Sequence, residues 1–300
     1  MENSEDRSRK SELRRPPWLK ARVNLGKDFA EVEQILHRWS LNTVCREAAC
    51  PNISECYNQR TATFLILGDV CTRNCTFCGV KKGTPGPLDP QEPERVAQAV
   101  KELGLHHVVI TSVTRDDLSD GGAHCFAGTI EEIRKINSDT VIELLIPDFR
   151  GSKESLAIIM DAFPNILGHN IETVPRLYPQ TRMKADYLQS LNVLNVVKEF
   201  SCLVTKSGLM LGLGETKNEI LQTMDDLRAV GCDLLTIGQY LSPASHNIVA
   251  KRYYHPQEFE EFICEGRKRG FKWIEAGPLV RSSFHAHEQW KKAQINSFGL

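Results

Sequence analysis

The stretch that organises this chain is an apolar run that leads directly into three closely spaced cysteines. It reads Thr63-Phe64-Leu65-Ile66-Leu67, followed by Gly68-Asp69-Val70-Cys71-Thr72-Arg73-Asn74-Cys75-Thr76-Phe77-Cys78-Gly79. The apolar run predicts a buried strand, and the C-x3-C-x2-C segment predicts a tight loop after it. Three thiolates from one loop can hold three irons of a 4Fe–4S cube, which leaves the fourth iron open to a small molecule. We therefore expect Cys71, Cys75 and Cys78 to hold a cluster that meets a substrate or cofactor.

Zinc and disulfides are the other chemistries open to closely spaced cysteines. A structural zinc site needs a fourth ligand, usually from a second C-x2-C pair or a pair of histidines. His106 and His107 lie too far along the chain to form a compact zinc knuckle with this loop. Three adjacent cysteines cannot all pair with one another as disulfides. An iron–sulfur cluster is therefore the favoured interpretation, and zinc remains the alternative.

From residue 61 onward, apolar strand-like runs alternate with amphipathic helical stretches. The strand-like runs cover residues 61–67, 107–113, 140–146, 165–171, 203–211, 233–237 and 271–275. The helical stretches cover residues 90–103, 123–136, 153–163, 187–200, 216–230 and 256–269. This alternation predicts an α/β fold with a parallel sheet, and about six such units fit a barrel or partial barrel. Periodicity does not distinguish a barrel from a doubly wound sheet.

Polar segments follow the predicted strands at their carboxyl ends. These segments are residues 111–117, 147–150, 169–172 and 212–215, and they are rich in polar and charged side chains. The cysteine loop also follows a strand, and ligands bind at the carboxyl edge of the sheet in barrels and in doubly wound folds. We therefore expect these segments and the cysteine loop to face one site.

A second cysteine group precedes the first predicted strand. Cys45, Cys50 and Cys56 have C-x4-C-x5-C spacing, so six of the ten cysteines fall between residues 45 and 78. Two incomplete three-cysteine groups in one chain strengthen the case for iron–sulfur chemistry. The remaining cysteines are expected to be small buried residues of helices or strands. They are Cys125, Cys202, Cys232 and Cys264.

The composition is that of an ordinary soluble globular protein. Hydrophobic residues make up 41% and charged residues 25% of the 300 positions. A net charge of -1 and a pI near 6.8 favour neither nucleic acid nor an anionic membrane as a partner. No apolar stretch reaches the length of a membrane span. The charged segment 1–20 lacks the apolar core of an export signal, so we expect the cysteines to remain in a reducing compartment.

The chain divides by pattern into four parts. Residues 1–15 are polar and expected to be disordered, and residues 16–60 form an N-terminal extension that carries the second cysteine group. Residues 61–276 contain the strand–helix repeats, and residues 277–300 form a C-terminal tail. In the tail, His285 and His287 are expected to be solvated. The segment Arg281-Ser282-Ser283-Phe284 is, on physical grounds alone, most simply a surface turn.

The segment Ser119-Asp120-Gly121-Gly122-Ala123 joins a strand-end loop to the start of a predicted helix. Paired glycines let a backbone approach a ligand, and free N–H groups at a helix start attract anions. Asp120 can also accept a hydrogen bond from an ammonium group. A plain loop with a helix cap explains the same residues, so both interpretations stay open.

Several motifs together resemble the lipoyl synthase family of radical S-adenosylmethionine enzymes. The resemblance covers residues 15–287 and is carried by both cysteine groups. Further matching motifs are Thr111-Ser112-Val113-Thr114-Arg115-Asp116-Asp117, Asp120-Gly121-Gly122, Ile146-Pro147-Asp148-Phe149, His169-Asn170-Ile171-Glu172-Thr173-Val174-Pro175-Arg176-Leu177 and Arg281-Ser282-Ser283-Phe284. The C-x3-C-x2-C motif marks only the superfamily, whereas the C-x4-C-x5-C group with the Arg-Ser-Ser tail indicates this family. The resemblance implies a partial parallel (β/α)6 barrel.

The resemblance also implies the ligands of two 4Fe–4S clusters. For the cluster that binds S-adenosyl-L-methionine they are Cys71, Cys75 and Cys78, and for an auxiliary cluster they are Cys45, Cys50, Cys56 and a tail serine. We match that serine to Ser283, with Ser282 as the alternative. The implied contacts of S-adenosylmethionine are Asp120 and Gly121 for the methionine moiety, Asn170 and Glu172 for the ribose, and Arg182 for the methionine carboxylate.

The reaction implied by the resemblance is the insertion of two sulfur atoms at carbons six and eight of a protein-bound octanoyl-lysine. No side-chain base can deprotonate these carbons, because protein pKa values span only roughly 4 to 13. Radical chemistry is therefore required, with the auxiliary cluster as the implied sulfur donor. The implied protein substrates are octanoylated lipoyl carrier domains of 2-oxoacid dehydrogenase complexes and the glycine cleavage H protein. An electron donor such as ferredoxin or flavodoxin and an iron–sulfur cluster carrier are also implied.

The expected location is the cytoplasm, or the mitochondrion if the source is eukaryotic. Two other functions remain open. One is a different radical enzyme whose second cluster relays electrons, which a serine ligand would argue against. The other is a zinc-stabilised binding protein without catalysis, which the metal content of the protein would distinguish.

Overall fold

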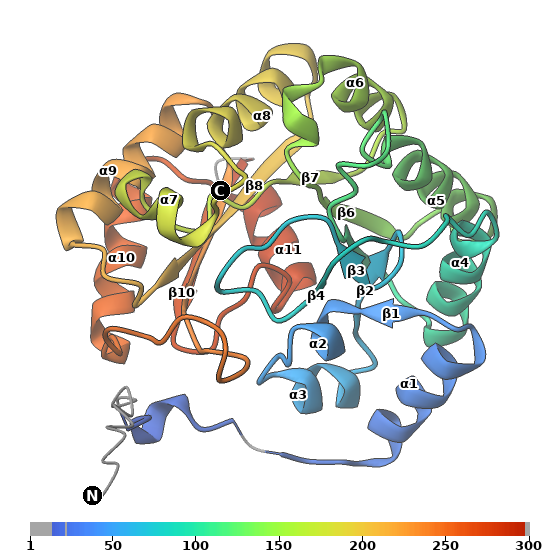
Figure 1. The fold of residues 1–300 in the computed structure, drawn as a ribbon, viewed down its shortest axis with the longest axis horizontal. Coiled ribbons are helices and arrows are strands. Elements are labelled where there is room, and N and C mark those ends of the chain that lie inside the picture. The colour runs from blue at the N-terminus through green and yellow to red at the C-terminus, as the bar shows by residue number, and fades with distance from the viewer. Residues whose placement is uncertain (1–13, 22, 298–300) are drawn as a thin grey trace, which may run out of the picture.

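The computed structural model describes residues 14–21 and 23–297. The predicted disorder of residues 1–15 therefore lies largely outside the described residues. Figure 1 shows strands near the centre of the molecule and most of the longer helices around its outside. Among the described helices, none is both long and apolar enough to cross a membrane.

An eight-stranded sheet, seven of whose strands are parallel, forms the centre of the fold. In sheet order its strands are β1 (Asn42–Thr43), β2 (Thr63–Ile66), β5 (His107–Ser112), β6 (Val141–Leu145), β7 (Ile166–Gly168), β8 (Val204–Leu211), β9 (Leu234–Gln239) and β10 (Trp273–Gly277). Only β1 is antiparallel, and it pairs with β2. The hydrogen-bonded order ends at β1 and β10, so the described strands form a partial, open barrel. The predicted α/β barrel fold is confirmed, and each predicted strand-like run overlaps one parallel strand.

Helices follow the strands and cover the outer face of the sheet (Figure 1). The longer helices are α1 (Lys27–Arg38), α4 (Glu92–Leu103), α5 (Ala123–Ile136), α6 (Lys153–Asp161), α8 (Tyr187–Phe200), α9 (Lys217–Ala229), α10 (Pro256–Lys268) and α11 (Ala286–Ser297). Short helices are η1 (Pro17–Leu19), α2 (Val44–Glu47), α3 (Ile53–Asn58), η2 (Phe149–Gly151), η3 (Pro175–Leu177) and α7 (Tyr178–Thr181). Two short strands, β3 (Val70–Cys71) and β4 (Lys81–Lys82), pair within the segment that carries the cysteine loop.

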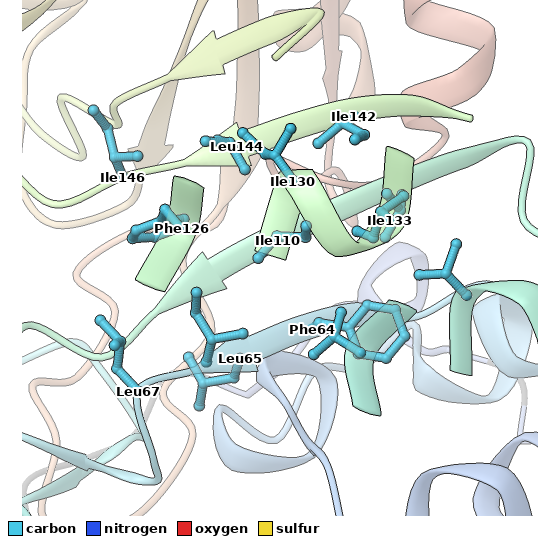
Figure 2. Close-up of a cluster of buried hydrophobic side chains, with 14 of the residues drawn as sticks. Phe64, Leu65, Leu67, Ile110, Phe126, Ile130, Ile133, Ile142, Leu144 and Ile146 are labelled. Atoms are coloured by element: carbon cyan, nitrogen blue, oxygen red, sulfur yellow. The ribbon is translucent and has the colours of Figure 1, made fainter. Parts of the chain in front are cut away.

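Successive residues of each strand face opposite sides of the sheet, which separates an apolar outer core from an inner face. Figure 2 shows Phe126 and Ile130 of α5 against Ile110 of β5 and Ile142 of β6. All four side chains are at most 2% exposed. This burial explains why the amphipathic helical pattern of residues 123–136 was visible in the sequence.

The inner face of the sheet carries a buried charge network. Glu143 lies between Ile142 and Leu144 of β6, which belong to the outer core, so its side chain faces inward. Its carboxylate accepts from Lys206 Nζ of β8 at 2.7 Å and lies 3.2 Å from His107 Nε2 of β5. Although burial opposes ionisation of Glu143, Lys206 and His107 lower its pKa. The network therefore joins three strands across the inside of the barrel.

The C-terminal tail is folded, and the expectation that its histidines are solvated is wrong for His287, whose Nδ1 atom is buried. The side chain of His285 is 37% exposed, in agreement with that expectation. Helix α11 begins at Ala286 and lies inside the ring of outer helices (Figure 1). Its Ala293 packs with Ile166 and Leu234, at the amino-terminal ends of β7 and β9. His287 makes an edge contact with the ring of His107, with 5.9 Å between ring centroids.

Candidate active site

The first predicted cluster loop leaves the carboxyl end of β2. Cys71 ends β3, and its Sγ atom accepts from the backbone N–H of Thr114 at 3.3 Å and of Arg73 at 3.4 Å. Burial raises the pKa of Cys75, and it raises the pKa of Cys78 to about 12. A metal must therefore displace protons from these thiols when it binds.

Arg73, inside the cysteine loop, fixes the loop to the ends of two strands. Its guanidinium donates to Asp148 at 2.6 and 2.8 Å and to Asp116 at 2.8 and 2.9 Å. Burial of Asp148 opposes its ionisation, but Arg73 lowers its pKa to about 2. Arg73 was not among the site residues predicted from the sequence. The available signal was an arginine between two cysteines, together with acids at two predicted strand ends.

Asn247 is a second residue that the sequence analysis missed. Its Nδ2 donates to the carbonyls of Thr76 and Cys78, at 3.0 Å in each case. The backbone N–H of Thr76 in turn donates to the carbonyl of Thr181 at 2.9 Å. The loop is thus held by segments far away in the sequence, and no local pattern predicts such contacts.

Asp120 and Gly121 make the contacts of a helix cap. The Asp120 carboxylate accepts from the backbone N–H groups of Gly122 at 2.9 Å and of His124 at 3.0 Å. Gly121 has φ +62°, and a Cβ atom there would lie 2.7 Å from the ring of Phe149. The cap that the sequence left open as the alternative therefore explains both residues, and their contact with S-adenosylmethionine stays a prediction.

Asn170, Glu172 and Arg182 lie together inside the barrel. Asn170 Nδ2 donates to Glu172 Oε1 at 3.1 Å, and Arg182 Nη1 donates to the Asn170 carbonyl at 3.1 Å. Burial raises the pKa of Glu172, with Arg182 opposing it. Arg182 Nε is buried and has no hydrogen-bond partner among the described residues. Glu172 has φ 66°, a strained conformation of the kind that concentrates at functional sites.

The second cysteine group lines a cavity of about 450 Å³ together with the tail serine Ser283. We call it the cysteine–serine cavity, defined by Cys45, Cys50, Cys56 and Ser283. Burial raises the pKa of Cys45 to about 11 and that of Cys56 to about 12. Among the described residues, no three Cys, His, Asp or Glu side chains are arranged around a single metal ion.

The cysteine–serine cavity lies at the opposite end of β2 from the cysteine loop. Ser283 Oγ accepts from Thr63 Oγ1, in the first residue of β2, at 2.7 Å. From Thr63 to Leu67 the strand advances roughly 13 Å. The sequence placed the cysteine loop at the carboxyl edge and made no prediction of where the second cysteine group lies. The structure has one cysteine group near each end of this strand.

The two tail serines face different partners. Ser282 Oγ lies 2.8 Å from Asn170 Nδ2 and 3.0 Å from Asn170 Oδ1, and it is absent from the lining of the cysteine–serine cavity. Ser283 is in that lining. This difference favours Ser283 over Ser282 as the predicted ligand.

The cysteines outside the two groups differ in exposure. Cys232 is buried and Cys125 is half-buried, but Cys202 and Cys264 are exposed. The expectation of burial is therefore wrong for Cys202 and Cys264. Cys202 follows the end of α8 and Cys264 lies on α10, where the amphipathic pattern leaves one helix face to solvent.

Comparisons with known families and relatives identify the family of the chain. A model of the radical SAM superfamily matches residues 65–227, and a model of the N-terminal domain of lipoyl synthase matches residues 1–50. The lipoyl synthase of Caldanaerobacter subterraneus subsp. tengcongensis is 54% identical over 275 residues, which cover 91% of this chain and 96% of that protein. That of Symbiobacterium thermophilum is 54% identical over 294 residues, which cover 98% and 92% of the two chains.

Solved structures share the fold at low sequence identity. Methylornithine synthase aligns with a TM-score of 0.55 and 14% identity, over 82% of this chain and 74% of that one. The FeFe-hydrogenase maturase of Carboxydothermus hydrogenoformans aligns with a TM-score of 0.57 and 13% identity, over 88% and 69% of the two chains. At these identities the likeness concerns the fold alone. From the family models and the close relatives, the chain belongs to the lipoyl synthase family of radical S-adenosylmethionine enzymes.

Proposed function

We propose that this chain inserts two sulfur atoms, at carbons six and eight, into an octanoyl chain attached to a lysine of a carrier protein. As a member of its family it is a radical S-adenosylmethionine enzyme that uses two 4Fe–4S clusters. When bound, one cluster with S-adenosylmethionine supplies the radical that removes hydrogen, and the other supplies sulfur. The protein supplies the ligands, the orientation of the reactants and the exclusion of water.

The observation that carries the proposal is the composition of the cysteine–serine cavity. Ser283 accepts a hydrogen bond from Thr63, which lies 220 positions earlier in the chain. It lines the same cavity as Cys45, Cys50 and Cys56. A serine oxygen is a harder donor than a thiolate and an unusual ligand in iron–sulfur proteins. Such a ligand suits an iron that has to be released as its sulfide leaves, and it suits a permanent electron relay poorly.

The charge around this cavity also fits an anionic cluster. Arg281 lines the cavity, and among the described residues its guanidinium donates to the carbonyl of Val280 but forms no ion pair. Burial lowers the pKa of Arg281, and a negative charge on Cys50 would raise it. A cluster held by thiolates carries negative charge, so it would stabilise the guanidinium in the cavity wall.

At the other end of β2, Arg182 and Glu172 have unused hydrogen-bonding capacity that suits S-adenosylmethionine. The buried Arg182 Nε lacks a partner, so its guanidinium can donate to the carboxylate of the methionine moiety. The Glu172 carboxylate can accept from the two ribose hydroxyls, with Asn170 beside it. We retain Asp120 and Gly121 as contacts of the methionine moiety, although Asp120 already accepts two backbone hydrogen bonds.

The cysteine loop is held rigidly by its surroundings. Arg73, with Asp116 and Asp148, and Asn247 fix the backbone around Cys71, Cys75 and Cys78. A rigid loop keeps the reacting atoms in one geometry. Such positioning lowers the activation barrier of a reaction between bound partners.

We infer the protein partners from the family. The carrier substrates are octanoylated lipoyl domains of 2-oxoacid dehydrogenase complexes and the glycine cleavage H protein. A low-potential donor such as ferredoxin or flavodoxin supplies electrons, and an iron–sulfur cluster carrier rebuilds the auxiliary cluster between turnovers. We also propose a cytoplasmic location, since the relatives named above are bacterial proteins.

The test is a single-turnover reaction of the anaerobically reconstituted protein. Reductant, S-adenosylmethionine and an octanoyl-lysine peptide are added, and mass spectrometry follows the peptide. We expect two sulfurs on the peptide and the loss of one cluster per product. The variant Cys56→Ala should lose roughly half of the iron, since each site holds one four-iron cluster, and still cleave S-adenosylmethionine. The variant Cys75→Ala should lose that cleavage.

The matched control is Cys264→Ser, which changes an exposed cysteine outside both groups. It should retain the iron content and sulfur insertion of the wild type. Formation of 5′-deoxyadenosine with two intact clusters and no sulfur on the peptide would indicate an electron-relay enzyme instead. Zinc in place of iron would refute the assignment of both sites.

A further inference from the structure

Ser282 joins the tail to the residues that we expect at the ribose of S-adenosylmethionine. Its Oγ lies 2.8 Å from Asn170 Nδ2 and 3.0 Å from Asn170 Oδ1. The same Asn170 Nδ2 donates to Glu172 Oε1 at 3.1 Å. Nδ2 carries two hydrogens, so it donates both to Glu172 and to Ser282 Oγ, while the hydroxyl of Ser282 donates to Oδ1. Ser282, Asn170 and Glu172 therefore form one hydrogen-bonded chain.

The residue after Ser282 reaches the other site. Ser283 Oγ accepts from Thr63 Oγ1 at 2.7 Å and lines the cysteine–serine cavity. One peptide bond thus separates a hydroxyl held at the Asn170 end from a hydroxyl presented to the second cysteine group. A shift of Ser282 away from Asn170 necessarily changes the position from which Ser283 can reach a ligand in that cavity.

The barrel is shaped to allow this contact. Gly208 of β8 lies against the pair, and a Cβ atom at that position would stand 2.7 Å from both Asn170 Oδ1 and Ser282 Oγ. Gly238 of β9 similarly allows the close approach of the Val280 carbonyl, with which a Cβ atom would collide. The tail therefore packs against two adjacent strands, β8 and β9, at positions where only glycine leaves enough space.

We propose that Ser282 is a positioning residue that couples the binding of S-adenosylmethionine to the seating of Ser283 in the auxiliary site. The proposal rests on the proposed function, which places the ribose at Glu172 and an iron at Ser283. When ribose hydroxyls donate to Glu172, that carboxylate is held more firmly and orients the Asn170 amide toward Ser282. Coupling between two sites is reciprocal, so an occupied auxiliary site must also favour S-adenosylmethionine binding.

The variant Ser282→Ala tests the coupling in the reconstituted holoenzyme. We expect S-adenosylmethionine to bind about five-fold more weakly, which corresponds to the ~1 kcal/mol of one neutral hydrogen bond. In the wild type, added S-adenosylmethionine should change the electron paramagnetic resonance spectrum of the reduced auxiliary cluster. That change should be lost in Ser282→Ala, while the iron content stays that of two clusters.

The matched control is Ser155→Ala. Ser155 is a buried serine on α6 that also makes one hydroxyl contact, with Ser152 Oγ at 3.1 Å, and it lies outside both sites. This variant loses a comparable buried hydrogen bond but should keep the wild-type affinity and spectral change. The double variant Ser282→Ala with Asn170→Ala should bind no more weakly than Asn170→Ala alone, because the two residues act as one unit.

Two results would overturn the coupling. One is a Ser282→Ala protein that keeps the wild-type affinity and the spectral response. The other is a wild-type spectrum of the auxiliary cluster that S-adenosylmethionine does not change. Both are distinguishable from failure of the proposed function, because the wild type would still insert sulfur into the octanoyl peptide in these cases.

Discussion

At the scale of single residues, glycines decide where the C-terminal tail lies. Gly208 and Gly238 both line the inner face of the sheet, and a side chain at either position would meet the tail. Neither has a left-handed φ, so space rather than backbone freedom requires glycine there. The arrangement of Ser282 and Ser283 therefore depends on residues that carry no chemistry of their own.

Replacing Gly208 by alanine should open the contact between Asn170 and Ser282. Overpacking of this kind costs roughly 1–3 kcal/mol, and denaturant unfolding of the metal-free protein measures it. Sulfur insertion should fall in the reconstituted variant. Gly128→Ala in helix α5 is the control, because the nearest neighbouring atom to its new Cβ, a side-chain carbon of Pro93 in α4, is 4.0 Å away and alanine is the better helix former. Equal behaviour of the two variants would contradict the role of Gly208.

His169 should make the unfolding free energy of the metal-free protein depend on pH. Burial, and then the nearby Arg182, lower the pKa of His169 to about 4. Between pH 6.5 and 4 the unfolded chain binds a proton at this histidine and the native protein does not. Its contribution is therefore complete above pH 6.5 and falls by about 3 kcal/mol as the pH decreases to 4. In His169→Gln the unfolding free energy should decrease less over this window; an equal decrease would show that His169 is not responsible.

At the scale of elements, the α2–α3 segment presents the second cysteine group. Thr43 caps α2, and its hydroxyl lies 2.8 Å from the hydroxyl of the fully buried Tyr57 on α3. Asn52, in the turn between the helices, donates to the carbonyl of Leu279 in the tail at 2.6 Å. The segment is thus tied both to itself and to the tail that brings Ser283.

Thr43→Ala should destabilise the protein more than Tyr57→Phe. Loss of the Tyr57 hydroxyl removes one hydrogen bond, worth about 1 kcal/mol. Loss of the Thr43 hydroxyl removes the helix cap as well and leaves a buried phenol unpaired, for a total of about 2–3 kcal/mol. Denaturant unfolding compares the two variants. If Tyr57→Phe proved the more damaging, the Thr43 cap would not organise this segment.

At the scale of the whole molecule, the open sheet has one cysteine group near each end of β2 and a charge network across its inner face. Lys206 of β8 reaches past β7 to Glu143 of β6, and both side chains are 3% exposed. A buried pair of this kind does not have to stabilise the fold, but it penalises the loss of one partner. The Lys206–Glu143 pair therefore links β6 and β8, which are not hydrogen-bonded to each other, and helps to maintain the curvature of the sheet.

Lys206→Met should cost about 3–5 kcal/mol, because it leaves the buried Glu143 carboxylate with only His107 beside it. Lys206→Met combined with Glu143→Leu should recover much of that loss, since no uncompensated charge remains. The control is Lys217→Met, which breaks an exposed pair with Glu261 and should cost under about 1 kcal/mol. Urea unfolding of all three variants measures these differences. A double variant as unstable as Lys206→Met would contradict the electrostatic explanation.

The sequence by itself determined the alternation of strands and helices and the identity of both cysteine groups. Residues 61–67 and 123–136 carry periodic apolar patterns, and local periodicity reflects which face an element buries. Spacing within one loop likewise indicates ligands that share a metal site, as for Cys71, Cys75 and Cys78. Family resemblance added the tail serine, although it left Ser282 and Ser283 as alternatives.

Only the tertiary structure decided which serine faces the second cysteine group and where that group lies. Ser283 meets Thr63 across 220 positions, and Asn247 reaches the loop across 171. Such contacts arise from the curvature of the open sheet, which brings distant segments together, and leave no local periodicity in the sequence. The fold of α11 was missed for a related reason. Its apolar residues pack against the ends of several strands rather than along one face of a helix pair, so the amphipathic pattern is weak.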